Sequence, residues 1–165
     1  MVHLSSGNYV DILRANESSK HIFFKSQERM CVLRRDYMEQ SDLFFSILEQ
    51  EEELIRLGIC GEGDYHRFME ICGDNIPLNT GKKYVTSLIY GGMQSIKPEV
   101  VHTLERSLVE SQEMSGEGRV RPGHILTAIA HQPTKEIGKA LKKANLPYEE
   151  VFNRVKSYYE SLQRP

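Results

Sequence analysis

The amino-acid sequence predicts an all-α fold made of two four-helix repeats. Apolar residues recur at helical spacing in eight segments, and the segments within residues 20–72 follow the same order as those within residues 101–159. Repeats of this length indicate supersecondary units that share one core. A chain of 165 residues, of which 39% are hydrophobic, is long enough to bury such a core as one domain.

We divide the chain into a leading segment (1–17), a first repeat (18–75), a strap between the repeats (76–96) and a second repeat (97–162). The repeats are most alike where apolar residues occupy positions i, i+1 and i+4, which lie on one face of a helix. These residues are Leu43, Phe44 and Ile47 in the first repeat and Ile125, Leu126 and Ile129 in the second. If the first repeat lacks five residues near Gln50, further pairs are Leu54 with Leu141, Ile59 with Leu146, Tyr65 with Phe152, and Phe68 with Val155.

In the first repeat, residues with strong positional preferences mark where helices begin and end. The serine pair at positions 18–19 can cap a helix over residues 20–35, and Ser41 precedes the short second helix. Gly58 is expected to end the third helix in the left-handed conformation that favours glycine. Asp64 then begins the closing helix.

In the second repeat, proline marks the start of each helix. Pro98 lies in the first turn of the opening helix, where its missing N–H has no partner to lose. Pro122 leads into the short helix, Pro133 and Thr134 begin the third, and Pro147 opens the last. All eight segments are therefore expected to be helical, with few alternatives to an all-α class.

The leading segment and the strap are more apolar than flexible linkers. The strap contains an apolar run and is expected to pack as a short helix or in an extended conformation. If the domain binds protein, we expect a helix or an extended peptide to lie in an apolar groove formed by these segments. The candidate binding residues are Tyr9, Ile12 and Leu13 from the leading segment and Tyr84, Leu88 and Tyr90 from the strap. The same residues can instead complete the core, and the sequence leaves both alternatives open.

Composition and charge argue against several classes of function. A formal net charge of −2, with only short basic runs, gives no reason to expect nucleic-acid binding. No stretch approaches the roughly 18 apolar residues of a membrane helix, and the polar start lacks the apolar region of a signal peptide. We therefore expect a cytoplasmic protein with no nucleic-acid partner and no membrane contact.

The three cysteines, Cys31, Cys60 and Cys72, are odd in number and lack the close spacing of a metal-binding pair. We expect them to be reduced, partly buried thiols. A metal site formed by Cys60, Cys72 and His66 is the alternative. The sequence also lacks the Gly-x-x-x-x-Gly-Lys-Ser/Thr motif that cradles nucleotide phosphates. No cofactor and no metal are therefore expected.

The second repeat carries a pattern that is found in a known family. Residues 123–129 read Gly-His-Ile-Leu-Thr-Ala-Ile, residues 137–141 read Ile-Gly-Lys-Ala-Leu, and Leu146 precedes the closing helix. This pattern resembles the second repeat of the Clp amino-terminal domain. The resemblance implies a pseudo-twofold helical domain, mounted on an AAA+ unfoldase, that docks substrates or adaptor proteins before ATP-driven threading. It also implies that the domain has no catalytic centre and is monomeric when isolated.

The chain departs from the family members that recognise phosphorylated arginine. In those members, each short helix starts with Thr-Glu, and the carboxylate grips the guanidinium. Here those positions hold Gln40-Ser41 and Pro122-Gly123, and neither pair supplies an anion. We therefore expect no phosphoarginine recognition of that kind. The extra leading segment is similar in placement to that of the type VI secretion unfoldase, which grips a sheath-protein helix.

Three functional classes remain. The first is a substrate- or adaptor-docking domain of a Clp-type unfoldase, and the second is a free-standing interaction or scaffold protein with the same fold. The third is a small hydrolase that would combine Ser107 with His102, His124 or His131, whose spacing lacks a nucleophile turn or a metal-ligand pattern. The acidic run at residues 49–53 is either a patch for a basic partner or a solvated helix start.

Overall fold

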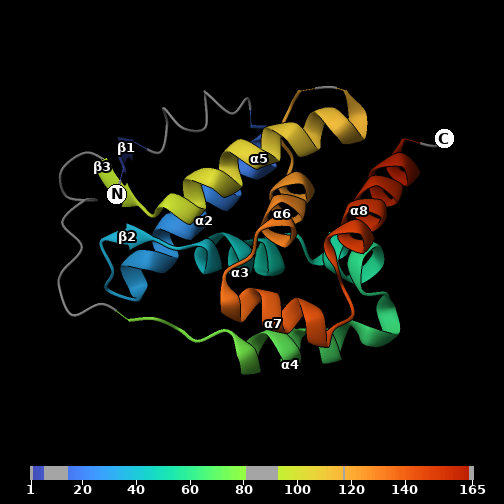
Figure 1. Ribbon diagram of the computed structural model, residues 1–165, viewed down its shortest axis with the longest axis horizontal. Helices are drawn as coiled ribbons and strands as arrows, with labels where there is room; N and C mark the ends of the chain where they lie inside the picture. Colours follow the sequence, from blue (N-terminus) through green and yellow to red (C-terminus); the bar gives the residue numbers. More distant parts are fainter. Residues whose placement is uncertain (1, 6–14, 81–92, 117, 164–165) are drawn as a thin grey trace.

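The computed structural model describes residues 2–5, 15–80, 93–116 and 118–163, which are mostly helical (Figure 1). The first half contains α2 (Glu17–Val32), α3 (Gln40–Gln50), the π-helical turn η1 (Leu54–Ile59), the 3₁₀ turn η2 (Glu62–Asp64) and α4 (Tyr65–Asn75). The second half contains α5 (Pro98–Ser115), α6 (Pro122–His131), α7 (Lys135–Lys143) and α8 (Tyr148–Leu162). The predicted all-α class is confirmed. Within the described ranges, no helix is long and apolar enough to span a membrane.

A small three-stranded sheet joins parts of the chain that are far apart in sequence. Its strands are β1 (Val2–Ser5), β2 (Tyr37–Met38) and β3 (Met93–Ile96), in the order β1-β3-β2. β1 pairs antiparallel with β3, and β2 pairs parallel with β3. The sequence did not predict these strands, because such short strands have little periodicity and depend on partners that only the tertiary fold brings together.

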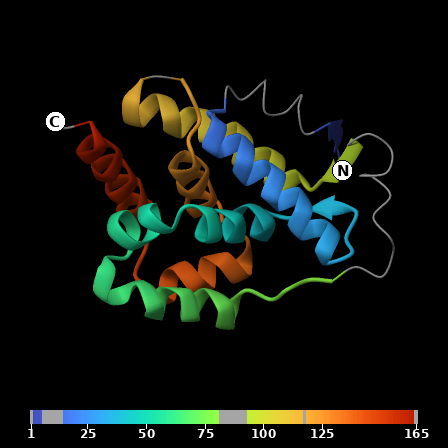
Figure 2. The same ribbon diagram turned by 180° about the vertical axis from the view of Figure 1, so that it is seen from behind.

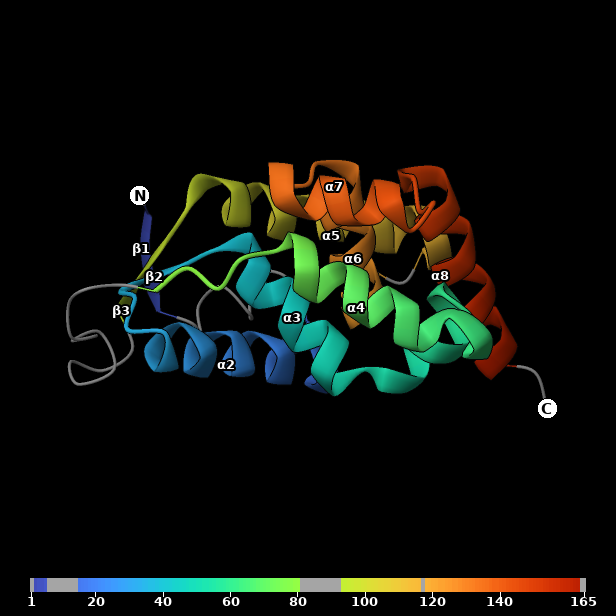
Figure 3. The same cartoon turned by 90° about the horizontal axis from the view of Figure 1, so that it is seen from below.

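α3 and α6 pack against each other at the centre of the molecule, and the other helices cover them (Figures 1 and 3). α5 packs on α6, and α2 packs on α3, as the view from behind shows (Figure 2). α4 and α7 lie side by side, and α8 packs on both α6 and η1. The last helix of the chain therefore contacts the first half directly, which joins the two halves into one core.

The core is continuous through both halves because α3 and α6 are covered on nearly all sides. The six paired residues at positions i, i+1 and i+4 of the two short helices are each at most 3% exposed: Leu43, Phe44, Ile47, Ile125, Leu126 and Ile129. Full burial of such a side chain stabilises the fold by about 1.5–3 kcal/mol relative to leaving it exposed. The helical spacing in the sequence therefore identified the buried face correctly.

The two short helices begin with equivalent hydrogen bonds. In α3 the N–H of Glu39 donates to Oδ2 of Asp42 at 2.8 Å, and in α6 the N–H of Arg121 donates to Nδ1 of His124 at 2.9 Å. Asp42 and His124 directly precede the paired residues Leu43 and Ile125, and each lies at the third helical position, where a side chain can cap the helix start. The order of helical segments also recurs in the two halves. The pseudo-twofold axis itself stays a prediction.

α2 begins earlier than the sequence predicts, at Glu17 rather than at residue 20. Its cap is Asn16, whose Oδ1 accepts from the N–H of Ser19 at 2.9 Å. The hydroxyl of Ser19, which was expected to cap the helix, is buried and donates to the carbonyl of Val120 at 2.8 Å. The prediction was wrong because the partner of this serine lies 101 residues away in the sequence.

α2 also ends early, at Val32 rather than near Arg35. Arg34 adopts a left-handed conformation with φ of 58°, and the N–H of Arg35 donates back to the carbonyl of Met30 at 2.8 Å. This turn directs the Arg35 side chain into the interior, where the residue is only 1% exposed. A buried arginine requires partners, and these lie at the start of α3.

Candidate protein-docking groove

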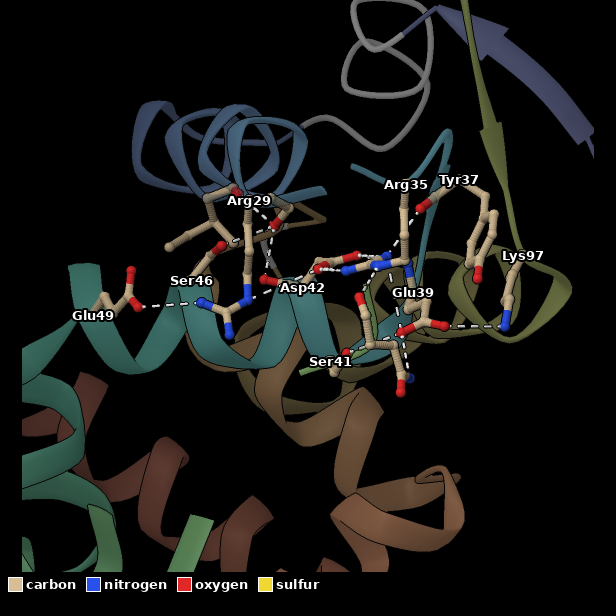
Figure 4. A network of polar contacts seen from close by, with 12 residues as sticks. Arg29, Arg35, Tyr37, Glu39, Ser41, Asp42, Ser46, Glu49 and Lys97 are labelled. Atoms are coloured by element: carbon tan, nitrogen blue, oxygen red, sulfur yellow. Dashed lines mark hydrogen bonds and ion pairs between the residues drawn. The ribbon is translucent and has the colours of Figure 1, made fainter. Parts of the chain in front are cut away.

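The start of α3 holds a buried polar cluster around Arg35 (Figure 4). Two guanidinium nitrogens of Arg35 donate to Asp42, at 2.8 Å and 2.5 Å, and the other hydrogen bonds go to the carbonyls of Tyr37 and Asn79. Burial alone would lower the pKa of Arg35, but the hydrogen bond to Asp42 and the charges of Asp42 and Glu39 raise it. Every nitrogen of this guanidinium therefore has a partner within the chain.

Glu39 completes the same cluster. Its carboxylate accepts from Nδ2 of Asn79 at 3.0 Å and from Nζ of Lys97 at 3.2 Å, and it lies 3.8 Å from Arg35. Burial alone would raise the pKa of Glu39, but the hydrogen bonds from Asn79 and Lys97 and the nearby positive charges lower it. The carboxylates that flank Gln40 and Ser41 are therefore occupied by cations of this chain.

Gln40 itself links the two halves. Its Nε2 donates to Oγ1 of Thr103 at 2.9 Å and to the carbonyl of Gln132 at 3.1 Å, while its Oε1 accepts from the N–H of Thr134 at 2.8 Å. The residue is completely buried. Gln40 occupies a position that was considered for ligand binding, but here its side chain connects the two halves of the chain.

The serine and histidines of the hydrolase alternative lie in different environments. Ser107 is completely buried and donates to the carbonyl of Leu104 in its own helix at 2.6 Å. His124 is 1% exposed and takes part in the start of α6. His102 and His131 line one depression beside α5, which neither of the buried residues lines.

The cysteine and histidine considered as metal ligands are also placed differently. Cys72 is completely buried, whereas the side chain of His66 is 90% exposed and lies 3.3 Å from Glu70. Among the residues whose placement is described, no group of three His, Cys, Asp or Glu side chains is arranged to hold a metal ion. Cys60 is partly buried, and its thiol contacts the carbonyl of Ile55 at 3.1 Å.

The predicted binding residues Tyr9, Ile12, Leu13, Tyr84, Leu88 and Tyr90 lie outside the described residues. Elsewhere, the exposed large apolar side chains are Phe24, Val32, Leu57, Leu78, Val109 and Leu162. Leu57 and Leu162 line the same groove, between η1 and α8. Single exposed apolar residues are ordinary, whereas two that line one groove make that groove a candidate docking surface.

One wall of the groove is the π-helical turn η1. The carbonyl of Ile55 accepts from the N–H of Cys60, five residues further on, at 3.0 Å, which gives the turn its wide geometry. Gly58 lies inside this turn, so the prediction that it ends a helix in a left-handed conformation was wrong. The glycine with a positive φ that follows this turn is Gly61, with φ of 82°.

Gly58 allows η1 and α8 to approach each other closely. A Cβ atom at this position would lie 3.1 Å from both Cβ and Cγ of Tyr158, closer than ordinary van der Waals contact. Glycine is therefore favoured here by the close partner helix and not by backbone conformation. Because Gly58 and Tyr158 are 100 residues apart in the sequence, the local sequence does not indicate this close approach.

The groove between η1 and α8 has a volume of about 540 Å³ and opens to solvent. Leu57 from η1 is 57% exposed, and Leu162 from the end of α8 is 58% exposed. Covering each of them would contribute about 1–2 kcal/mol, because full burial of a leucine is worth about 1.5–3 kcal/mol. The groove is therefore suited to apolar side chains of a protein partner.

Charged residues border the groove. Arg154 donates to Glu150 at 2.7 Å and also to the carbonyl of Ile59, which ties α8 to η1. Glu53 lines the groove near Tyr158, and burial followed by the charges of Glu53 and a neighbouring carboxylate raises the pKa of that phenol.

The acidic residues at positions 49–53 have two kinds of surroundings: ion pairs within the chain and the border of the groove. Glu49 lies 3.4 Å from Arg29, and Glu52 lies 2.5 Å from Arg56, so these two carboxylates pair within the chain. Glu53 instead lines the groove.

No family model matches the chain, and no curated protein matches it. Among solved structures, its fold is similar to that of the N-terminal domain of the caseinolytic protease associated chaperone ClpD from Arabidopsis thaliana. The likeness covers 89% of this chain and 95% of that one, with a TM-score of 0.62 and a sequence identity of 14%. The chain therefore has a fold of the Clp N-terminal domain type.

Proposed function

We propose that this chain is a protein-binding domain that docks substrates or adaptors for a Clp-type ATP-dependent unfoldase. The observation that carries the proposal is the likeness of nearly the whole fold to the N-terminal domain of ClpD. The groove between η1 and α8 supports it, because Leu57 and Leu162 offer apolar surface that the chain itself leaves uncovered. Docking needs no reactive group, only a surface that binds polypeptide.

The docking surface is tested with an unfolded model protein. Fluorescently labelled, reduced and carboxymethylated α-lactalbumin is titrated with the domain, and binding is followed by anisotropy. We expect the double variant Leu57→Asp, Leu162→Asp to bind about tenfold more weakly, a loss of about 1.4 kcal/mol. Val32→Asp is the matched control, because Val32 is 80% exposed and does not line the groove. Equal affinity of the double variant and the control would contradict the groove as the docking surface.

The link to an unfoldase is tested by domain exchange. The chain is fused to an unfoldase ring that lacks its own N-terminal domain, and ATP-dependent unfolding of a fluorescent substrate is measured. Restored unfolding, lost again with Leu57→Asp and Leu162→Asp, is the expected result. Substrate binding without restored unfolding would favour the free-standing scaffold instead.

A finer form of the proposal concerns the partner. By placement of its leading segment, the chain would grip a helix of a type VI secretion sheath protein. Residues 6–14 of that segment lie outside the described residues. A sheath-protein helix peptide is expected to shift the backbone amide resonances of residues 8–25, and unchanged spectra at millimolar peptide would remove this form of the proposal.

A further inference from the structure

α4 lies beside α7 and the turn that leads into α8 (Figure 3). A separate pocket is lined by residues of α4 and of that turn. It has a volume of about 220 Å³, and both halves of the chain line it. Its apolar wall is formed by Phe68 and Ile71 from α4 and by Ala144 and Leu146 from the turn. Phe68 and Leu146 also belong to the main core, so this wall is held in place by the packing of the whole domain.

The rim of this pocket is positive. Arg67, Lys143 and Arg154 line it, against the single carboxylate of Asp64. Arg154 is neutralised by Glu150 at 2.7 Å, whereas the partner of Lys143 among the described residues is the neutral amide oxygen of Asn75 at 2.9 Å. Two of the three cations therefore keep an unneutralised charge at the rim.

Arg67 has the least favourable surroundings of the three cations. It lies in the first turn of α4, where the helix dipole disfavours a cation and favours an anion. It makes no hydrogen bond or ion pair with any residue that the structure describes. A carboxylate placed between Arg67 and Lys143 would interact favourably with both side chains and with the start of the helix.

The size of the pocket restricts its occupant. Sites for small molecules usually have volumes of about 300–1,000 Å³, so a pocket of about 220 Å³ is suited to one large side chain of a longer partner. The apolar wall selects an aliphatic or aromatic side chain, and the positive rim selects an acidic neighbour.

We propose that this pocket binds one large apolar side chain of a partner segment that carries an aspartate or glutamate beside it. The inference rests on the proposed docking function and adds the chemistry of the docked segment. Arg154 lines both the pocket and the groove between η1 and α8, so one segment can occupy the two sites together.

The test compares three short peptides that share a central leucine and differ in its neighbours, which are aspartate, lysine or serine. Binding is followed through the amide resonances of Phe68, Ile71 and Leu146. The leucine–aspartate peptide is expected to bind tightest and to lose affinity as salt is raised, because exposed charges are screened. Equal affinities for the three peptides would overturn the proposal.

Reversing the charges of the rim tests whether the rim causes the preference for the leucine–aspartate peptide. In the variant Arg67→Glu, Lys143→Glu, the leucine–aspartate peptide is expected to bind about tenfold more weakly and the leucine–lysine peptide more tightly. Lys139→Glu on the same helix as Lys143 is the matched control, because Lys139 is exposed and does not line the pocket. A preference for the aspartate peptide that survives the double reversal would overturn the proposal. Displacement of the leucine–aspartate peptide by an equal concentration of inorganic phosphate would also overturn the proposal.

The peptide experiments distinguish a failure of the inference about this pocket from a failure of the proposed docking function. If unfolded α-lactalbumin binds and the peptides show no charge preference, only the inference about this pocket fails. If the unfolded protein and all the peptides fail to bind, the docking function fails with it.

Discussion

Arg35 and Asp42 form a buried ion pair with two hydrogen bonds, at 2.8 Å and 2.5 Å, between the end of α2 and the start of α3. Neither residue is more than 1% exposed. Asp42 also accepts the N–H of Glu39 and so caps α3. The pair therefore fixes the turn between the first two helices and the beginning of the central helix at the same time.

Removing one member of this pair should be costly. We expect Asp42→Ala to lower the free energy of unfolding by about 3–5 kcal/mol, because it leaves the Arg35 charge buried without its main partner. Urea denaturation followed by circular dichroism measures the change. Glu28→Gln is the control, since its ion pair with Lys25 is exposed at the surface and should contribute less than about 1 kcal/mol.

The double variant Arg35→Met, Asp42→Asn tests the coupling. Its destabilisation should be smaller than the sum of the two single changes, because no unpaired charge is left in the interior. Strict additivity would show that the two side chains do not depend on each other.

A side chain at Gly123 should destabilise the protein. A Cβ at this position would lie 2.6 Å from the hydroxyl of Tyr159 and 2.7 Å from Cγ1 of Val155, so these side chains of α8 would have to shift. We expect Gly123→Ala to lower the free energy of unfolding by about 1–3 kcal/mol. Gly73→Ala is the control within α4: it meets open space and should stabilise the protein by roughly 0.5–1 kcal/mol through helix propensity. Destabilisation of equal size at both glycines would contradict the close approach.

His124 should make stability depend on pH. Burial, followed by the charge of Arg121, lowers the pKa of His124 to about 4. The pKa in the unfolded chain is about 6.5, so the unfolded state takes up a proton first as the pH falls. The contribution of this residue is therefore fully present above pH 6.5 or so and decreases by about 3 kcal/mol as the pH falls to about 4.

The measurement is the free energy of unfolding at several pH values between these limits. His124→Asn keeps a hydrogen-bond acceptor near the N–H of Arg121 and should show a weaker pH dependence than the wild type. His66→Gln is the control, because the side chain of His66 is 90% exposed. The same pH dependence in all three proteins would rule out His124 as its source.

The thiol of Cys72 should be unreactive in the folded protein. Burial, with a smaller contribution from the nearby Cys60, raises the pKa of Cys72 to about 12, so very little thiolate forms near neutral pH. We expect Ellman's reagent to label Cys72 only when the protein unfolds, whereas the partly exposed Cys31 reacts in the native state. Mass spectrometry of peptides after timed labelling distinguishes the two. Equal rates at Cys31 and Cys72 in the folded protein would contradict the buried position.

Several helix starts and the buried face of the core were determined by local sequence. Pro98 and Pro122 begin α5 and α6, and Pro147 precedes α8, as predicted. Proline has a fixed φ and no N–H to lose, so its effect on a helix start does not depend on distant residues. The apolar residues at helical spacing in α3 and α6 are buried for a similarly local reason, since their spacing places them on one face.

The docking groove and the contacts between distant residues were determined only by the tertiary structure. Gly58 packs closely against Tyr158, Ser19 donates to Val120, and Gln40 bridges to Thr103 and Thr134. Each relationship joins residues that are far apart in the chain, so no local pattern indicates it. The exposure of Leu57 and Leu162 has the same cause: an apolar residue on a helix is buried or exposed according to what packs over it, and the fold leaves these two uncovered.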